Sequence, residues 1–207
     1  MNALSWGLLG AAAVAAVADW IAVWRRPTAT ERVLKPLVVV LLVVAALALD
    51  PADGAQRAWF VTALVLSLAG DVLLLPTVDR FVPGLASFLL AHVAYVAGFA
   101  VAGAEVRPGL AVLVLLVPVA VRVVTAVARS DRALVVPVGV YIAVIATMVG
   151  FAIGHGDALG IAGALTFAAS DSILALDRFD RHRRWMPTAV MVTYHVAQAL
   201  LVASLVP

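Results

Sequence analysis

Apolar residues run along this chain in long stretches that short polar breaks separate. A helix that crosses a membrane needs about 20 mostly apolar residues. Cutting the chain at its charged and proline- or glycine-containing breaks gives eight candidate stretches: 3–24, 34–50, 58–76, 84–103, 109–128, 133–153, 158–176 and 186–206. The pattern predicts an all-α, polytopic membrane protein whose eight transmembrane helices form one domain over residues 1–207.

The composition fits this class. Of the 207 residues, 65% are hydrophobic and 13% are charged, and the mean hydropathy is +1.11. Soluble domains are about half apolar and about a quarter charged. The formal net charge of +2 comes from scattered loop arginines, so it does not suggest nucleic-acid binding. The chain has no cysteine, which excludes disulfides, thiolate nucleophiles and cysteine-ligated metals.

The first apolar stretch is interpreted as a helix that the protein keeps. A cleaved signal peptide carries basic residues before its apolar region. In this chain Arg25 and Arg26 follow the apolar region instead, as they do when a helix stops in the membrane.

The distribution of positive charge predicts an orientation, because lysine and arginine are enriched in cytoplasmic loops. The first, third, fifth and seventh loops hold eleven of these residues: Arg25, Arg26, Arg32, Lys35, Arg80, Arg129, Arg132, Arg178, Arg181, Arg183 and Arg184. The other loops hold only Arg57 and Arg107. The preference for arginine over lysine, together with abundant Ala and Val, suggests a GC-rich bacterial genome. We expect a multi-pass protein of the bacterial inner membrane with both termini outside.

Polar side chains within the spans fall at one depth in this topology. Three aspartates lie five or six residues before a cytoplasmic loop, about 8–9 Å from it at about 1.5 Å per residue: Asp19, Asp71 and Asp171. Four aromatic or imidazole residues lie about eight residues, or roughly 12 Å, after such a loop: His92, Tyr141, Tyr194 and His195. We therefore expect a polar layer inside the cytoplasmic leaflet.

The two halves of the chain resemble each other around Asp71 and Asp171. The segment 70-GDVLL-74 aligns with 170-SDSIL-174, and 79-DRF-81 aligns with 177-DRF-179. The third and seventh spans have the same orientation, so the similarity suggests a parallel four-helix repeat about an axis along the membrane normal.

Aspartates within spanning helices are costly, at about +2.5 to +3.5 kcal/mol near the helix centre, and they usually mark a pathway or a site. The structural alternative is an aspartate that links helices through a hydrogen bond to a neighbouring side chain. The repeated context of Asp71 and Asp171 favours a functional pair. Asp19 lies beside Trp20 near the interface, within expected reach of water, so pairing with Lys35 or an arginine is as plausible as catalysis.

Several other residues have both a functional and a structural interpretation. Arg122 either snorkels to the cytoplasmic surface or binds phosphate. Lys35, next to Pro36, either marks the start of a helix or binds a lipid headgroup. Ser170 is either a nucleophile or, as we favour, the small residue aligned with Gly70 that lets helices approach closely.

His92 and Tyr95 lie one turn apart on one helix face. They suit either a site near the aspartates or a hydrogen-bonded packing pair. A metal site needs three or four convergent ligands, and the chain has no H-x-x-x-H or H-E-x-x-H motif. We therefore expect no metal and no other cofactor.

A pair of carboxyl groups remains as the candidate chemistry. Burial and like-charge repulsion both oppose a second negative charge, so one carboxyl keeps its proton while the other ionises. Such a pair supplies a general acid and a general base without a metal or a covalent intermediate. This chemistry suits the addition of water across an acid-sensitive bond such as an enol ether, an acetal or an epoxide.

The motifs around these residues resemble those of the lysoplasmalogenase (YhhN-like) family. They are G-D-x-L-L at 70–74, F-x-x-G-L-x-x-F-x-x-x-H-x-x-Y at 81–95 and G-A-L-x-F-x-x-S-D-x-x-L-A at 163–175. Lys35-Pro36 and Tyr194 with Ala197-Gln198 also fit, so the resemblance covers the second to the eighth span. It implies an eight-helix hydrolase that cleaves the vinyl ether bond of lysoplasmalogens to a fatty aldehyde and glycerophosphoethanolamine or glycerophosphocholine.

Asp71 and Asp171 match the aspartate positions of that family. Our sequence-based hypothesis makes Asp71 the acid and Asp171 the base, in roles that the two could exchange. Further residues are expected to orient water and substrate: His92, Tyr95, Tyr141, Ser170, Tyr194 and Gln198. Lys35 and Arg122 are expected to hold the phosphate of a lysophospholipid substrate.

A proton-coupled carrier or lipid-binding protein is the alternative, with the carboxyl groups as a proton relay. Alternating access favours a site near the bilayer midplane. The ionisable groups of this chain are expected in one leaflet, which favours the enzyme.

Overall fold

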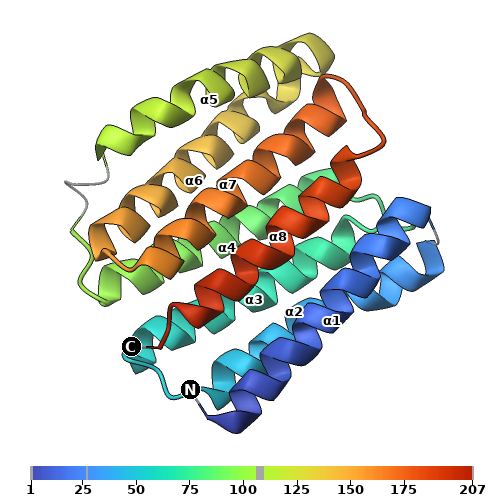
Figure 1. Ribbon diagram of the computed structural model, residues 1–207. Coiled ribbons are helices and arrows are strands. Elements are labelled where there is room, and N and C mark those ends of the chain that lie inside the picture. The colour runs from blue at the N-terminus through green and yellow to red at the C-terminus, as the bar shows by residue number, and fades with distance from the viewer. Residues whose placement is uncertain (1, 27, 106–109, 207) are drawn as a thin grey trace.

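The computed structural model describes residues 2–26, 28–105 and 110–206 as a bundle of helices joined by short loops (Figure 1). This part of the chain forms eight α-helices and one short 3-10 helix, η2 (Arg132–Leu134). The α-helices are α1 (Ala3–Arg25), α2 (Thr28–Ala48), α3 (Gly54–Leu73), α4 (Phe81–Val101), α5 (Leu110–Ser130), α6 (Val135–His155), α7 (Ala158–Phe179) and α8 (Met186–Ala203). The all-α prediction with eight helices is confirmed.

The largest difference from the predicted boundaries is at the start of α2. This helix begins at Thr28 rather than at residue 34, and it continues through Pro36. The interpretation of Lys35 as the start of a helix is therefore wrong. Glu31 and Lys35 lie four residues apart, a spacing at which opposite charges support a helix. A search for apolar stretches misses such a polar first turn.

Six of the described helices are long and apolar enough to cross a membrane: α1, α3, α4, α6 together with η2, α7 and α8. The protein is therefore a polytopic membrane protein. The first turns of α2 carry Glu31, Arg32 and Lys35, and its membrane crossing and that of α5 stay predictions.

Neighbouring helices close a ring in the order α1, α2, α3, α4, α6, α7, α8 and back to α1. In Figure 1, α6, α7, α8 and α1 lie in front of α4, α3 and α2. The remaining helix, α5, packs on the outside of α6 and α7. The ring brings α3 and α7, which carry the two repeated aspartates, into one bundle.

The two halves of the chain share part of this packing. The α3–α4 contact corresponds to the α7–α8 contact, and the α4–α6 contact corresponds to the α8–α2 contact. The first helix of each half differs, because α1 packs on α2 and α8 whereas α5 packs on α6 and α7. The four-helix repeat stays a prediction that most, but not all, of these contacts support.

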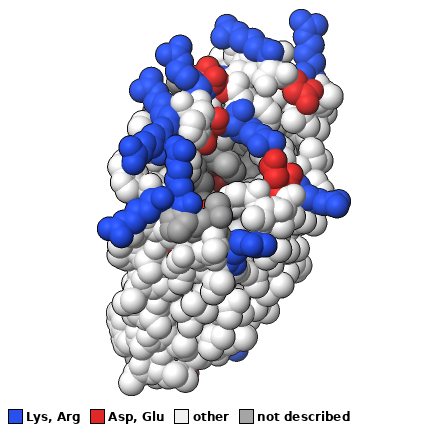
Figure 2. Space-filling view, turned by 90° about the vertical axis from the view of Figure 1, so that its right-hand side faces the viewer, with Lys and Arg blue, Asp and Glu red and all other residues white. Residues whose placement is uncertain are grey.

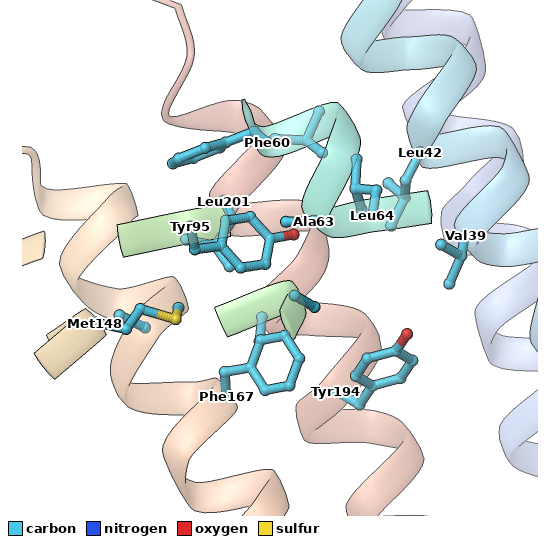
Figure 3. Close-up of a cluster of buried hydrophobic side chains, with 14 of the residues drawn as sticks. Val39, Leu42, Phe60, Ala63, Leu64, Tyr95, Met148, Phe167, Tyr194 and Leu201 are labelled. Atoms are coloured by element: carbon cyan, nitrogen blue, oxygen red, sulfur yellow. The ribbon is translucent and has the colours of Figure 1, made fainter. Parts of the chain in front are cut away.

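Aromatic side chains fill the centre of the bundle (Figure 3). Phe60 of α3 lies edge to face with Tyr95 and Phe99 of α4, with ring centroids 4.9 and 5.1 Å apart. Phe167 of α7 lies 4.5 Å from the ring of His92 on α4. Edge-to-face pairs of this kind contribute about 0.5–1.5 kcal/mol each beyond the burial of their area. They fix α3, α4 and α7 relative to one another beside the polar layer.

Small residues allow close helix contacts next to both repeated aspartates. A Cβ atom at Gly70 would lie 2.5 Å from Cε2 of Phe88 on α4. Ser170 is buried, and its hydroxyl donates to the carbonyl of Val190 on α8 at 3.0 Å. Small residues at helix contacts are typical of membrane bundles, and this geometry agrees with the packing interpretation of Ser170.

Arginine side chains gather at one end of the molecule (Figure 2). The loops that follow α1, α3, α5 and α7 lie there, and we call it the arginine-rich end. Both termini lie at the opposite end (Figure 1). Arg107 lies outside the described residues. The cytoplasmic location of the arginine-rich end stays a prediction.

Candidate active site

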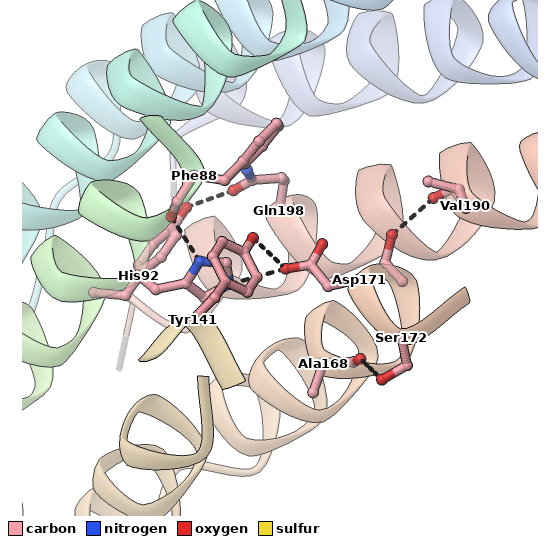
Figure 4. A network of polar contacts seen from close by, with 10 residues as sticks. Phe88, His92, Tyr141, Ala168, Asp171, Ser172, Val190 and Gln198 are labelled. Carbon is pink, nitrogen blue, oxygen red and sulfur yellow. Dashed lines mark hydrogen bonds and ion pairs between the residues drawn. The ribbon is translucent and has the colours of Figure 1, made fainter. Parts of the chain in front are cut away.

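Asp171 on α7 accepts a hydrogen bond from a neighbouring helix and lies close to a histidine (Figure 4). The hydroxyl of Tyr141 on α6 donates to Oδ2 of Asp171 at 2.6 Å. Nε2 of His92 on α4 lies 3.5 Å from the same oxygen. Nδ1 of His92 lies 2.7 Å from the carbonyl oxygen of Phe88, and it must donate there because a carbonyl only accepts. A neutral His92 therefore presents an Nε2 lone pair to Asp171.

Asp71 on α3 has a more polar set of partners. The hydroxyl of Tyr194 on α8 donates to its Oδ2 at 2.7 Å. Nζ of Lys35 on α2 lies 3.6 Å from its Oδ1. Both side chains of this ion pair are buried, with 0% of Asp71 and 6% of Lys35 exposed. A cation and a hydroxyl donor beside Asp71 both favour its ionised form.

The partners of the two carboxyl groups differ in chemistry but come from corresponding helices of the two halves. Each has one partner from the preceding helix, which is Lys35 for Asp71 and Tyr141 for Asp171. Each has a second partner from the last helix of the other half, which is Tyr194 for Asp71 and His92 for Asp171. This pattern is expected if a four-helix unit was duplicated and the last helix of each copy supplies a partner to the aspartate of the other copy.

Both carboxyl groups line one cavity of about 150 Å³. Lys35, Ser170 and Tyr194 line it too. A water molecule needs about 10–15 Å³ of such space, so the cavity has room for several waters. We call it the polar cavity. It combines two carboxyl groups, a buried cation and space for water and a small polar group.

Two other predicted site residues form a separate pair. The hydroxyl of Tyr95 on α4 donates to Oε1 of Gln198 on α8, and both side chains are fully buried. Neither residue lines the polar cavity. Their contact links α4 to α8 at a level further from the arginine-rich end than His92.

Arg122 also lies away from the polar cavity. Its side chain is 66% exposed, and its Nη2 lies 2.7 Å from Oδ2 of Asp180. This surface pair agrees with the snorkelling interpretation of Arg122. The structure does not place its guanidinium beside the two aspartates.

Asp19 lies in a different environment from the one expected. Its side chain has no exposed area, and neither of its carboxyl oxygens has a hydrogen-bond partner among the described residues. Asp19 is not exposed to water, and among the described residues it forms no ion pair with Lys35 or an arginine. Both expectations for Asp19 are therefore wrong. The indole of neighbouring Trp20 donates to Nδ1 of His195 on α8 at 3.1 Å, which docks α1 with Asp19 turned inward.

Two charged residues that line the polar cavity were not among the predicted site residues: Glu31 and Asp177. The spacing of Glu31 and Lys35 places both on one face of α2, a signal that would have identified Glu31. Asp177 follows Asp171 by six residues on α7, slightly less than two turns. Among the described residues, no group of three or more His, Asp and Glu side chains is arranged to hold a metal ion.

Comparisons with known proteins agree with the earlier resemblance. Residues 30–205 match the YhhN family. The lysoplasmalogenase TMEM86B of Homo sapiens is 34% identical over 142 residues, which cover 69% of this chain and 61% of the human protein. The match thus spans less than two thirds of that relative. No solved structure matches the chain.

Two further relatives are covered over more of their length. The TMEM86B lysoplasmalogenase of Sus scrofa is 32% identical over 176 residues, covering 85% of this chain and 75% of the pig protein. A lysoplasmalogenase of Mycobacterium tuberculosis is 34% identical over 178 residues, covering 82% of this chain and 67% of the mycobacterial protein.

Proposed function

The chain belongs to the YhhN family, and on that premise we propose that it is a lysoplasmalogenase, with all eight helices crossing the membrane. The reaction is hydrolysis of the vinyl ether bond of a lysoplasmalogen to a fatty aldehyde and glycerophosphoethanolamine or glycerophosphocholine. Relatives from human, pig and a mycobacterium carry the name lysoplasmalogenase. The observation that carries the proposal is a pair of carboxyl groups, one fully buried and one 11% exposed, that have different partners and line one polar cavity.

The partners of the two carboxyl groups favour Asp171 as the acid and Asp71 as the base. Each carboxyl accepts a hydrogen bond from a tyrosine hydroxyl, so the difference lies in Lys35, which stabilises a carboxylate at Asp71. Among the described residues no lysine or arginine forms an ion pair with Asp171, and the lone pair of a neutral His92 faces it. A protonated carboxyl satisfies that lone pair, whereas a carboxylate would be repelled by it. This assignment is the reverse of the sequence-based one.

The reaction then proceeds in three steps. Asp171 donates its proton to the β-carbon of the enol ether, which leaves an oxocarbenium ion at the α-carbon. Asp71 stabilises that cation and takes a proton from the water that attacks the α-carbon. The resulting hemiacetal breaks its bond to the glycerol oxygen, which receives the proton held by Asp71, and the aldehyde is released. Asp171 regains its proton from the hemiacetal hydroxyl as that hydroxyl becomes the carbonyl of the aldehyde.

The other residues of the site orient the reactants. Tyr141 and Tyr194 hold the two carboxyl groups through their hydroxyl hydrogen bonds. Lys35 has three N–H donors, so it can contact the substrate phosphate while it remains beside Asp71. His92 orients the acidic proton of Asp171. Tyr95 and Gln198 maintain a contact between α4 and α8 outside the polar cavity, whereas Ser170, which lines the cavity, links α7 to α8.

Hydrolysis by the purified protein in liposomes tests the proposal. We expect release of fatty aldehyde from a lysoplasmalogen in the absence of any proton gradient, and none from the matching lysolipid with a saturated ether. The saturated ether has no double bond to protonate, so it serves as the control. Products are measured by mass spectrometry. Transport of unchanged lipid without aldehyde would contradict the enzyme and support the carrier.

A further inference from the structure

Asp171 lines a second hollow in addition to the polar cavity. This hollow is an apolar groove between α5, α6 and α7, with Leu85 of α4 at one side. Besides Tyr141, Asp171 and Ser172, its lining is hydrocarbon, including Leu116, Val138 and Ile142. We call it the α5–α7 groove. The Asp171 carboxyl therefore stands where a polar cavity and an apolar groove meet.

The packing of α5 beside the groove differs from that of its counterpart in the first half of the chain. In the first half of the chain, α1 covers the contact between α2 and α8. Its counterpart α5 does not take the corresponding place against α4, and it lies outside on α6 and α7 instead. Val123, Val127 and Val138 there form a small hydrophobic cluster separate from the main core. Tyr141 belongs to the main core, and it lines the groove together with Val123, Val138 and Asp171.

We propose that the α5–α7 groove binds the single hydrocarbon chain of the lipid substrate and presents its first carbons to Asp171. This inference rests on the proposed function and adds where the substrate chain lies. A lysolipid is polar at one end and apolar at the other. The polar cavity suits its polar end, and the α5–α7 groove suits its hydrocarbon chain. The groove runs along α7 from Ala168 to Phe179, about 16 Å at about 1.5 Å per residue.

The vinyl ether bond, which joins the polar and apolar parts of the substrate, then lies at Asp171, the residue that lines both hollows. With the glycerophospho group in the polar cavity beside Lys35, and the chain in the α5–α7 groove beside Ile142, the enol ether lies next to Asp171. One apolar groove beside Asp171 provides a place for one chain, in agreement with a lysolipid substrate.

A third hollow between α1, α2 and α8 offers a comparison. It is also apolar, and Ala13, Trp20 and His195 contribute to its lining. Neither Asp71 nor Asp171 lines it, and the Trp20 indole already donates to His195. A chain bound there would leave its polar end away from both carboxyl groups.

Photocrosslinking in liposomes tests the placement without requiring hydrolysis. The probe is a lysophosphatidylethanolamine with a saturated ether-linked chain that carries a diazirine. We expect labelled peptides from α5 and α6 around Leu116 and Ile142, with labelling removed by unlabelled lysolipid but not by diacyl phospholipid. Labelling centred on α1 and α8, or spread over all membrane-facing helices without competition by lysolipid, would overturn the inference.

Two matched variants, each replacing an alanine with phenylalanine, sharpen the experiment. Ala146→Phe fills the α5–α7 groove, whereas Ala13→Phe fills the hollow between α1, α2 and α8. We expect Ala146→Phe to lower competed labelling about tenfold, which corresponds to displacing about two methylene groups of the chain. Ala13→Phe should leave it unchanged. The opposite ranking, or equal effects in two variants that keep the thermal stability of the parent protein, would contradict the placement.

The outcomes separate this inference from the proposed function. Competed labelling of the groove in a protein that releases no aldehyde would support a single-chain lipid site and refute the hydrolase. Aldehyde release with no competed labelling of the groove would support the hydrolase and refute the chain site.

Discussion

Replacing Asp171 with asparagine is expected to lower aldehyde release from lysoplasmalogen about 10²- to 10⁴-fold, the usual contribution of general acid catalysis. Asparagine has nearly the same shape, and its carbonyl can still accept the hydrogen bond from Tyr141. It has no acidic proton to give to the β-carbon. The variant should therefore fold and bind lipid while the chemical step fails. Initial rates with saturating lipid measure this effect directly.

Asp180→Asn is the matched control. Asp180 pairs with exposed Arg122 outside the polar cavity, so the same chemical change there should leave the rate within about twofold, in line with the small contribution of surface ion pairs. Groove labelling by the saturated-ether probe confirms that Asp171→Asn still binds a lysolipid. If Asp171→Asn released aldehyde at nearly the parental rate, Asp171 would not be the general acid.

Replacing Lys35 with methionine is expected to destabilise the protein by about 3–5 kcal/mol, the cost of leaving one member of a buried ion pair without its partner. Methionine keeps most of the length of the lysine side chain and removes its charge. Among the described residues, the Tyr194 hydroxyl would then be the remaining hydrogen-bond partner of the buried Asp71 carboxylate. Denaturant or thermal unfolding in detergent measures the loss.

The double variant Lys35→Met with Asp71→Asn provides the decisive comparison. Removing both charges restores most of the stability, because a neutral pair has no uncompensated buried charge. Aldehyde release should stay as low as in Asp71→Asn alone, since the base is absent from both. If the double variant were no more stable than Lys35→Met, the buried ion pair would not explain the stability of the site.

The helical fold could be predicted because its signal is local. Each span is a continuous apolar stretch, and the short loops leave adjacent helices little choice but to run antiparallel. The start of α2 was missed because Glu31, Arg32 and Lys35 make its first turns polar. The position of α5 outside the ring was also not predictable, because an apolar helix can pack equally well on several neighbours in a membrane.

The two aspartates of the candidate site could be proposed from the sequence, but the full cavity lining and the pairings could not. The repeated aspartates and the polar layer identified Asp71 and Asp171. That Asp71 pairs with Lys35 while Asp171 lies beside His92 depends on how the helices rotate in the ring. Those pairings favour the reversed assignment of acid and base. The buried position of Asp19 depends in the same way on the contact of Trp20 with α8.

In the proposed mechanism a carboxyl group protonates the vinyl ether and water completes the cleavage. The most direct measurement is hydrolysis of a lysoplasmalogen by the purified protein in D₂O, with mass spectrometry of the aldehyde after immediate reduction to the alcohol. We predict a product with one deuterium on the carbon next to the former carbonyl, because the proton of Asp171 exchanges with solvent before it is transferred. An aldehyde without deuterium at that carbon would contradict the acid-base mechanism.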